Sequence, residues 1–176
     1  KITNIPKTNK FEIGYKFGLE FFYSKNGRSF ISKLKNKIIW LDLKLFDIPN
    51  TVVSSINSLK DLKNINYITV HASGGLEMMR EVKKKAKKIN KKLKIIGVTV
   101  LTSFDTNSFK KVGFSKPIST IVMKQAKLIK AAKLDGIVCS GYEAKKIKKI
   151  CKNMDIITPG IRLTGDHRQD QKRVMI

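Results

Sequence analysis

Residues 41–51 read LDLKLFDIPNT and directly follow an apolar run, IIW. The apolar residues predict a strand, yet three charged residues interrupt it. Asp42 and Lys44 are two positions apart, so an extended strand projects both side chains from one face and the leucines from the other. Because burying charge is costly unless it is paired, this pattern predicts either a structural ion pair or a functional site at the strand end.

Asp47 precedes an isoleucine and a proline in the same stretch. Proline cannot donate to a sheet ladder, and it disfavours a helical conformation in the residue before it. We therefore expect Asp47 in a loop. Beyond the proline, Asn50 or Thr51 can cap a helix. The inward stripe of that helix would be Val52, Ile56 and Leu59.

Strand patterns alternate with helical patterns outward from this stretch. The expected strands cover residues 11–18, the run from residue 38, and residues 67–71, 94–101, 135–139 and 155–158. Apolar residues at helical spacing lie in residues 28–35, after the proline, and in residues 79–93, 121–132 and 144–154. This alternation predicts a parallel sheet of βαβ units, either doubly wound or closed as a TIM (β/α)8 barrel.

Polar residues follow nearly every expected strand. They are Asp42, Lys44, His71, Thr102, Ser103, Ser140 and Arg162. In a TIM barrel these loops converge on the face that carries active sites, whereas an open sheet would scatter some of them. The pattern therefore favours the barrel.

Composition indicates one domain, residues 1–176, with an ordinary 41% of hydrophobic residues. No apolar run reaches the roughly 18 to 20 residues of a membrane span, and no signal-peptide pattern is present, so we expect a cytoplasmic protein without a membrane partner. Cys139 and Cys151 are too few for a disulfide framework and should be reduced. Cys139 has no histidine placed to activate it as a nucleophile.

The net charge of +24 raises RNA binding as a different class of function. The excess is nearly all lysine and is densest in residues 83–94, KKKAKKINKKLK. Apolar residues recur there at helical spacing, so the lysines should occupy the outer face of an amphipathic helix. Arginine and aromatic readout residues are missing from this run, which favours a solvated face and no nucleic-acid partner.

Seven motifs together resemble the orotidine 5'-phosphate decarboxylase family, from about Phe11 to Met175. They are YKFGLEFF (15–22), LDLKLFDIPNT (41–51), VHASGG (70–75), VTVLTS (98–103), DGIVCS (135–140), TPGIR (158–162) and DQKRVM (170–175). The resemblance implies a TIM barrel that forms homodimers with shared active sites and uses no cofactor. It also implies a carboxy-lyase that converts orotidine 5'-monophosphate to uridine 5'-monophosphate in de novo pyrimidine biosynthesis.

The same resemblance implies roles for individual residues. The catalytic set would be Lys16, Asp42, Lys44 and Asp47, with Lys44 protonating the product and Asp47 supplied by the partner subunit. Substrate contacts would come from Lys16, Asp42, Thr51, Thr102, Arg162 and Gln171. Among these, Thr51 would reach across the dimer interface, Thr102 would contact the pyrimidine, and Arg162 and Gln171 would contact the phosphate.

The chain departs from the family pattern at three places. Nothing precedes Lys1 to supply the family's first strand, and nothing follows Ile176 to supply its eighth. Leu163 also replaces the proline that usually follows the GIR motif. We therefore expect a fragment that contains strands two to seven of the barrel.

A related alternative is a magnesium-dependent sugar-phosphate decarboxylase or aldolase of the same superfamily, which shares the Asp-x-Lys-x-x-Asp pattern. The continuation IPNT argues against it. With two histidines and no clustered carboxylates, a metal site is not expected. His71 is expected to form hydrogen bonds at a strand end, and His167 to lie in a loop.

Overall fold

The computed structural model describes residues 13–161, 172, 173 and 175. In this part of the chain, six parallel strands form one sheet in sequence order. They are β1 (Gly14–Gly18), β2 (Ile38–Leu45), β3 (Tyr67–His71), β4 (Lys94–Val98), β5 (Gly136–Val138) and β6 (Asp155–Ile157). A doubly wound sheet reverses its strand order at a switch point, and this sheet does not. The sequential order therefore agrees with the favoured barrel alternative.

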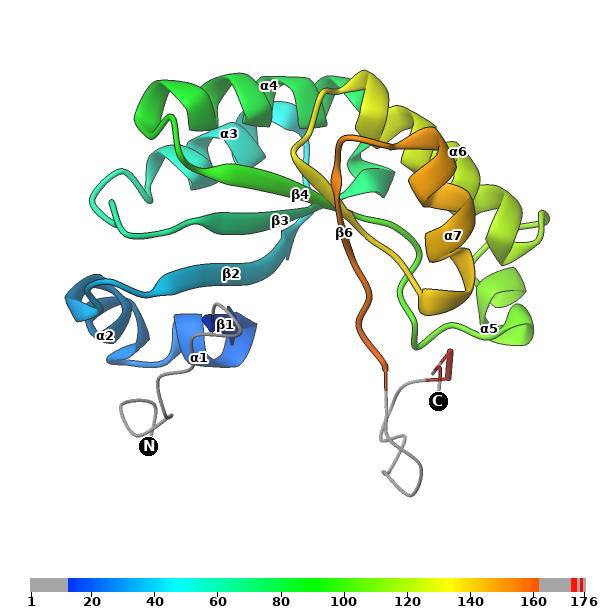
Figure 1. Cartoon of the computed structure of the whole chain (residues 1–176), viewed down its shortest axis with the longest axis horizontal. Coiled ribbons are helices and arrows are strands. Elements are labelled where there is room, and N and C mark those ends of the chain that lie inside the picture. The colour runs from blue at the N-terminus through cyan, green and yellow to red at the C-terminus, as the bar shows by residue number, and fades with distance from the viewer. Residues whose placement is uncertain (1–12, 162–171, 174, 176) are drawn as a thin grey trace.

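Helices connect the strands, and Figure 1 shows the sheet curving beneath α3, α4, α6 and α7. The helices are α1 (Leu19–Tyr23), α2 (Gly27–Lys33), α3 (Pro49–Asn57), α4 (Gly75–Ile89), α5 (Thr106–Lys111), α6 (Ile118–Ala131) and α7 (Gly141–Ile150), with a 3-10 turn, η2 (Ala72–Gly74), before α4. These helices cover the convex side of the curved sheet.

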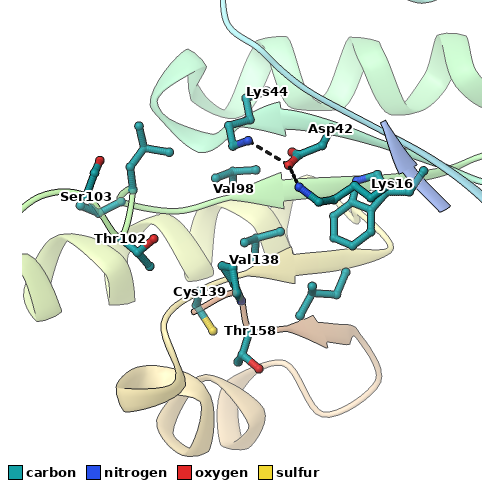
Figure 2. Close-up of a pocket in the computed structure, with 14 residues that line it drawn as sticks. Lys16, Asp42, Lys44, Val98, Thr102, Ser103, Val138, Cys139 and Thr158 are labelled. Carbon is teal, nitrogen blue, oxygen red and sulfur yellow. Dashed lines mark hydrogen bonds and ion pairs between the residues drawn. The ribbon is translucent and has the colours of Figure 1, made fainter. Parts of the chain in front are cut away.

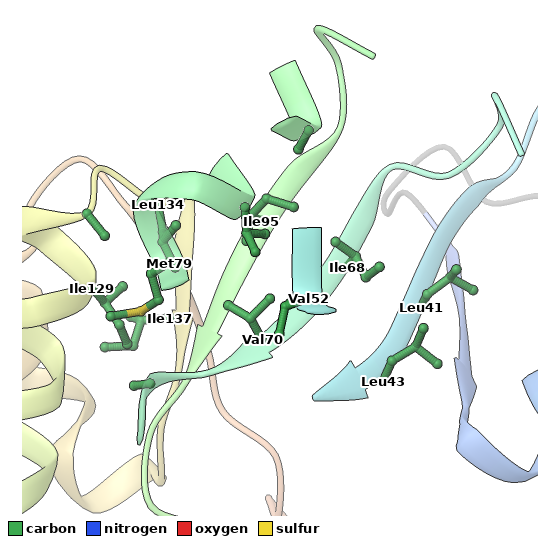
Figure 3. Close-up of a cluster of buried hydrophobic side chains, with 14 of the residues drawn as sticks. Leu41, Leu43, Val52, Ile68, Val70, Met79, Ile95, Ile129, Leu134 and Ile137 are labelled. Carbon is green, nitrogen blue, oxygen red and sulfur yellow. The ribbon is translucent and has the colours of Figure 1, made fainter. Parts of the chain in front are cut away.

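The core lies between the sheet and its helices (Figure 3). Strand residues Leu41, Ile68 and Ile95 are fully buried, and Met79 of α4 and Ile129 of α6 are fully buried with them. Buried side chains of the strands and of α4 and α6 thus belong to one apolar core. Burial of such side chains stabilises the fold by about 1.5 to 3 kcal/mol each.

Most predicted elements are present, with different ends. The strand expected at residues 67–71 is found as such, whereas the run at 94–101 ends as a strand at Val98. The short helices α1 and α5 were not expected, since five or six residues are too few to show a helical period. The chain turns sharply from β3 into α4, where Gly75 adopts a φ of 86° that favours glycine.

The helices contradict two specific expectations, one on the cap of α3 and one on Lys83 of α4. Neither Asn50 nor Thr51 caps α3, because the helix already begins at Pro49, whose missing N–H and fixed φ suit the first helical position. Lys83 does not lie on the solvated face of α4, since it is only 8% exposed and its ammonium group reaches Asp135. Within α4, Lys84, Lys87 and Lys88 are exposed as predicted. The helix ends at Ile89, however, so Lys91, Lys92 and Lys94 of the lysine-rich run lie outside it.

The described residues contain no helix that is both long enough and apolar enough to cross a membrane. Both cysteines in the described part are free thiols and buried.

Candidate active site

Asp42 and Lys44 lie near the carboxyl end of β2, where the strand leaves regular geometry. Leu41 pairs with Ile68 of β3, and Leu45 pairs with Val70, so β2 bulges between the two leucines. Lys44 lies in this bulge with a φ of 46°, a left-handed conformation that is uncommon outside glycine. The prediction of a regular extended strand is therefore wrong at Lys44, although its side chain still reaches Asp42.

Asp42 binds two ammonium groups through the same carboxylate oxygen (Figure 2). Asp42 Oδ2 lies 2.8 Å from Lys16 Nζ and 3.0 Å from Lys44 Nζ. The Asp42 side chain is 10% exposed, whereas those of Lys16 and Lys44 are 54% and 38% exposed. The carboxylate of Asp42 is thus buried, and the two lysines that bind it are more accessible to solvent.

Three influences set the pKa of the Asp42 carboxyl. Burial is the largest of them and raises the pKa, because it removes the charged form from water. The hydrogen bonds and positive charges of Lys16 and Lys44 together outweigh burial, so the pKa lies below its ordinary value of 3.8. Asp42 is therefore a carboxylate at neutral pH. Lys16, Asp42 and Lys44 together are called the array below.

Thr69 of β3 completes the surroundings of Asp42. Its hydroxyl donates to Asp42 Oδ1 at 3.1 Å and accepts a hydrogen bond from the main-chain N–H of Lys44 at 2.8 Å. A threonine within a β-branched strand is expected from strand propensity alone, so no separate signal in the sequence pointed to this contact.

The array forms one wall of a cavity of about 500 Å³, a size typical of small-molecule sites. Thr102 and Ser103, from the segment after β4, lie on another side, and Val98 and Val138 contribute apolar surface (Figure 2). The cavity therefore combines an apolar wall with a cationic end, which suits a flat ring that carries an anionic group.

Thr102 also marks where the C-terminal segment meets the cavity. Its carbonyl oxygen accepts hydrogen bonds from the N–H groups of Lys172 and Arg173, at 3.1 and 3.0 Å. Arg173 forms an ion pair with Glu143 at 2.5 Å and donates to the carbonyl of Val100 at 2.9 Å. These contacts hold part of the DQKRVM motif beside the loop that carries Thr102.

Asp47 and Thr51 do not join the array within this chain. Asp47 is exposed in a bend after β2, as expected, and its carboxylate accepts a hydrogen bond from the N–H of Ile48 at 2.7 Å. Thr51 is exposed on α3. Neither residue lines the cavity. Arg162 and Gln171, the expected phosphate contacts, lie outside the described residues, as does His167.

The other polar residues singled out after strands serve local structure. His71 Nδ1 accepts a hydrogen bond from the N–H of Ser73 at 3.2 Å, and burial followed by the charge of Lys44 lowers its pKa. Ser140 is fully buried and caps α7. Burial, followed by the charge of Glu143, raises the pKa of the Cys139 thiol to about 12, which disfavours the thiolate that a nucleophile requires.

No cluster of three or more potential metal ligands of the His, Cys, Asp or Glu type occurs among the residues that the structure describes. The functional groups that the described residues bring to the cavity include the Asp42 carboxylate, the ammonium groups of Lys16 and Lys44, and the hydroxyl groups of Thr102 and Ser103.

Comparison with known proteins agrees with the motif pattern. A family model described as "Orotidine 5'-phosphate decarboxylase / HUMPS family" matches residues 8–176. The orotidine 5'-phosphate decarboxylase of Carboxydothermus hydrogenoformans is 46% identical over 168 residues, which cover 92% of this chain and 69% of that protein. That of Wolbachia pipientis is 42% identical over 161 residues, covering 90% and 69%.

Solved structures that resemble this chain include members of the same family. The orotidine 5'-phosphate decarboxylase of Lactobacillus acidophilus has a TM-score of 0.78 at 35% identity, covering 84% of this chain and 68% of that chain. The enzyme from Methanocaldococcus jannaschii, complexed with the inhibitor BMP, has a TM-score of 0.65 at 28% identity, covering 88% and 69%. The chain spans 64% to 74% of the length of its curated relatives.

Proposed function

Because the chain belongs to the orotidine 5'-phosphate decarboxylase / HUMPS family, we propose that it converts orotidine 5'-monophosphate to uridine 5'-monophosphate and CO2. This carboxy-lyase reaction would serve de novo pyrimidine biosynthesis, and we place it in the cytoplasm without a cofactor. The observation that carries the proposal is the array in which buried Asp42 holds Lys16 and Lys44 at the wall of the cavity.

The reaction explains why a cation is needed there. When the bond between the ring carbon and the carboxylate carbon breaks, CO2 leaves and the electron pair stays on the ring carbon. No extended π-system accepts this charge, so a fixed positive charge beside the carbon must stabilise it. Lys44 Nζ would supply that charge and then donate its proton to the carbon, and the neutral amine would regain a proton from solvent.

Asp42 and Lys16 would keep Lys44 ready for this step. Asp42 holds the ammonium group of Lys44 in place through a contact of 3.0 Å, and Lys16 binds the same carboxylate oxygen at 2.8 Å. The carboxylate would also lie near the departing carboxylate of the substrate, so repulsion between the two would be relieved as CO2 leaves.

Electrostatics from one lysine is insufficient by itself. A pair of unit charges 4 Å apart interacts by about 4 kcal/mol at an effective dielectric constant of 20, whereas enzymes lower barriers by roughly 8 to 23 kcal/mol. Binding energy from the remote phosphate must therefore contribute. By resemblance, Arg162 and Gln171 would provide that contact, and Thr102 would contact the pyrimidine.

We further propose a homodimer with shared sites. Asp47 and Thr51 are exposed beyond the end of β2 and do not line the cavity of their own chain. In a twofold dimer, these residues would enter the neighbouring subunit's cavity and complete its array. Residues 1–176 would form one TIM-barrel domain in which β1 to β6 correspond to strands two to seven.

The proposed function is tested by following uridine 5'-monophosphate formation from orotidine 5'-monophosphate in the presence of EDTA. We expect turnover to be unaffected by the chelator. Activity that disappears with EDTA and returns with magnesium would instead favour a metal-dependent sugar-phosphate enzyme of the same superfamily.

A further inference from the structure

We infer that Thr69 is a positioning residue of the active site, one whose single hydroxyl fixes both the carboxylate of Asp42 and the main chain of Lys44. Thr69 is fully buried in β3. Its Oγ1 donates to Asp42 Oδ1 at 3.1 Å and accepts from the Lys44 N–H at 2.8 Å. The inference rests on the proposed function, because it assigns Thr69 a role in that reaction.

Both contacts need a hydroxyl. A threonine hydroxyl has one proton to donate and lone pairs to accept with, so it can serve Asp42 and Lys44 through one atom. Valine has nearly the same shape but can do neither. In a valine variant, the N–H of Lys44 and Asp42 Oδ1 would each lose the hydrogen bond that Thr69 provides.

The contact to Lys44 acts where the backbone is unusual. Lys44 has a left-handed φ of 46° within the bulge of β2. Its N–H donates to the side chain of Thr69 on the neighbouring strand. Residues in such conformations persist where their surroundings hold them, and this hydrogen bond is one such restraint. It fixes the point from which the Lys44 side chain leaves the sheet.

The contact to Asp42 decides which oxygen the lysines share. Thr69 binds Oδ1, and Lys16 and Lys44 both bind Oδ2. Without a donor at Oδ1, the carboxylate can rotate until each lysine has its own oxygen, which would move Lys44 Nζ away from its present position. Loss of a donor would also raise the pKa of Asp42, because the hydrogen bond stabilises the charged form.

The test compares Thr69→Val with Thr69→Ser, which restores the hydroxyl. For Thr69→Val, we expect kcat to fall by about tenfold or more while KM changes by less than about threefold, since the array acts on the transition state. The acid limb of the kcat profile should move to higher pH, and the carbon-13 titration of the Asp42 carboxyl should move the same way. Thr69→Ser should restore all three.

Thr99 offers a matched control. It is also a fully buried threonine near the end of the adjacent strand β4, and its hydroxyl donates to the carbonyl of Val138 at 2.8 Å, away from the array. Thr99→Val removes a buried hydroxyl of the same kind. It should reduce stability comparably while leaving kcat, the acid limb and the Asp42 titration as in the wild type.

Wild-type kcat and Asp42 titration in Thr69→Val would overturn the inference. The same effects in Thr99→Val would also overturn it, because they would then follow from any lost hydroxyl. If Thr69→Val does not fold, Thr69→Cys replaces it in the test. The cysteine thiol is a weak hydrogen-bond donor, so we expect smaller changes in kcat, the acid limb and the Asp42 titration, in the same directions. The carboxyl titration needs no turnover, so it still tests the contact if the protein fails to decarboxylate orotidine 5'-monophosphate.

Discussion

Lys83 of α4 and Asp135, which directly precedes β5, form an ion pair at the amino ends of the strands. Asp135 also accepts a hydrogen bond from the N–H of Ile95 at 2.6 Å. The Lys83 side chain is 10% exposed and that of Asp135 25%. The pair therefore links a helix to two strands at their amino ends. The array lies at the opposite, carboxyl end of the sheet, so a role in stability is expected for the pair.

Lys83→Met should destabilise the protein by about 3 kcal/mol, because it leaves the largely buried charge of Asp135 without its partner. Lys84→Met is the matched control, since Lys84 is 65% exposed and lies 3.8 Å from Glu81. Its effect should stay within about 0.5 kcal/mol. Urea unfolding measures both. Equal losses in the two variants would mean that the Lys83 pair adds nothing to stability.

The depressed pKa of Asp42 predicts how stability depends on pH. A carboxyl whose pKa is lower in the folded state contributes stability that is present above its ordinary value of 3.8 and is lost as pH falls through the folded pKa. The difference in unfolding free energy between wild type and Asp42→Asn should therefore be constant above about pH 5 and change only below it. A difference that stays constant under acid conditions would contradict the lowered pKa.

The lysine-rich face of α4 should not be an RNA-binding site. Neutralising Lys84, Lys85, Lys87 and Lys88 together should leave decarboxylase turnover unchanged. Wild-type binding to a generic RNA should be weak and should fall steeply with salt. Affinity that persists at physiological salt and disappears in the fourfold variant would favour nucleic-acid binding.

The array was only partly predictable from the sequence. The pairing of Asp42 with Lys44 followed from their spacing on a strand. However, Lys44 reaches Asp42 from a left-handed backbone within a bulge, which a period of two does not reveal. The contact of Lys16 with Asp42 joins residues on neighbouring strands, and only the family resemblance pointed to it.

The roles of Lys83 and Thr69 were not predicted, and for the same physical reason. Each side chain binds a partner that is far away in the sequence. Lys83 was assigned to the outer face of its helix, but its long stem lets the ammonium group reach Asp135, 52 positions away. Thr69 fitted an ordinary strand pattern, and only the neighbouring strand makes it a partner of Asp42. In contrast, the strand of residues 67–71 was predictable because its signal is local.

Shared sites can be tested by complementation. Lys44→Ala and Asp47→Ala should each be nearly inactive, but a heterodimer would contain one site with both lesions and one with neither. Random mixing makes about half of the dimers heterodimeric with one good site of two, so about a quarter of wild-type activity should return. No recovery after verified subunit exchange would mean that Asp47 acts within its own chain.

The role of Lys44 is tested by the turnover number of Lys44→Ala with saturating orotidine 5'-monophosphate. Lys88→Ala, which changes an exposed lysine of α4, is the control. We expect Lys44→Ala to lose turnover while retaining its fold and much of its nucleotide binding, because the ammonium group acts on the transition state. Lys88→Ala should match the wild type. Turnover of Lys44→Ala within about tenfold of wild type, a barrier change of only about 1.4 kcal/mol, would contradict the assignment of Lys44 as cation and proton donor.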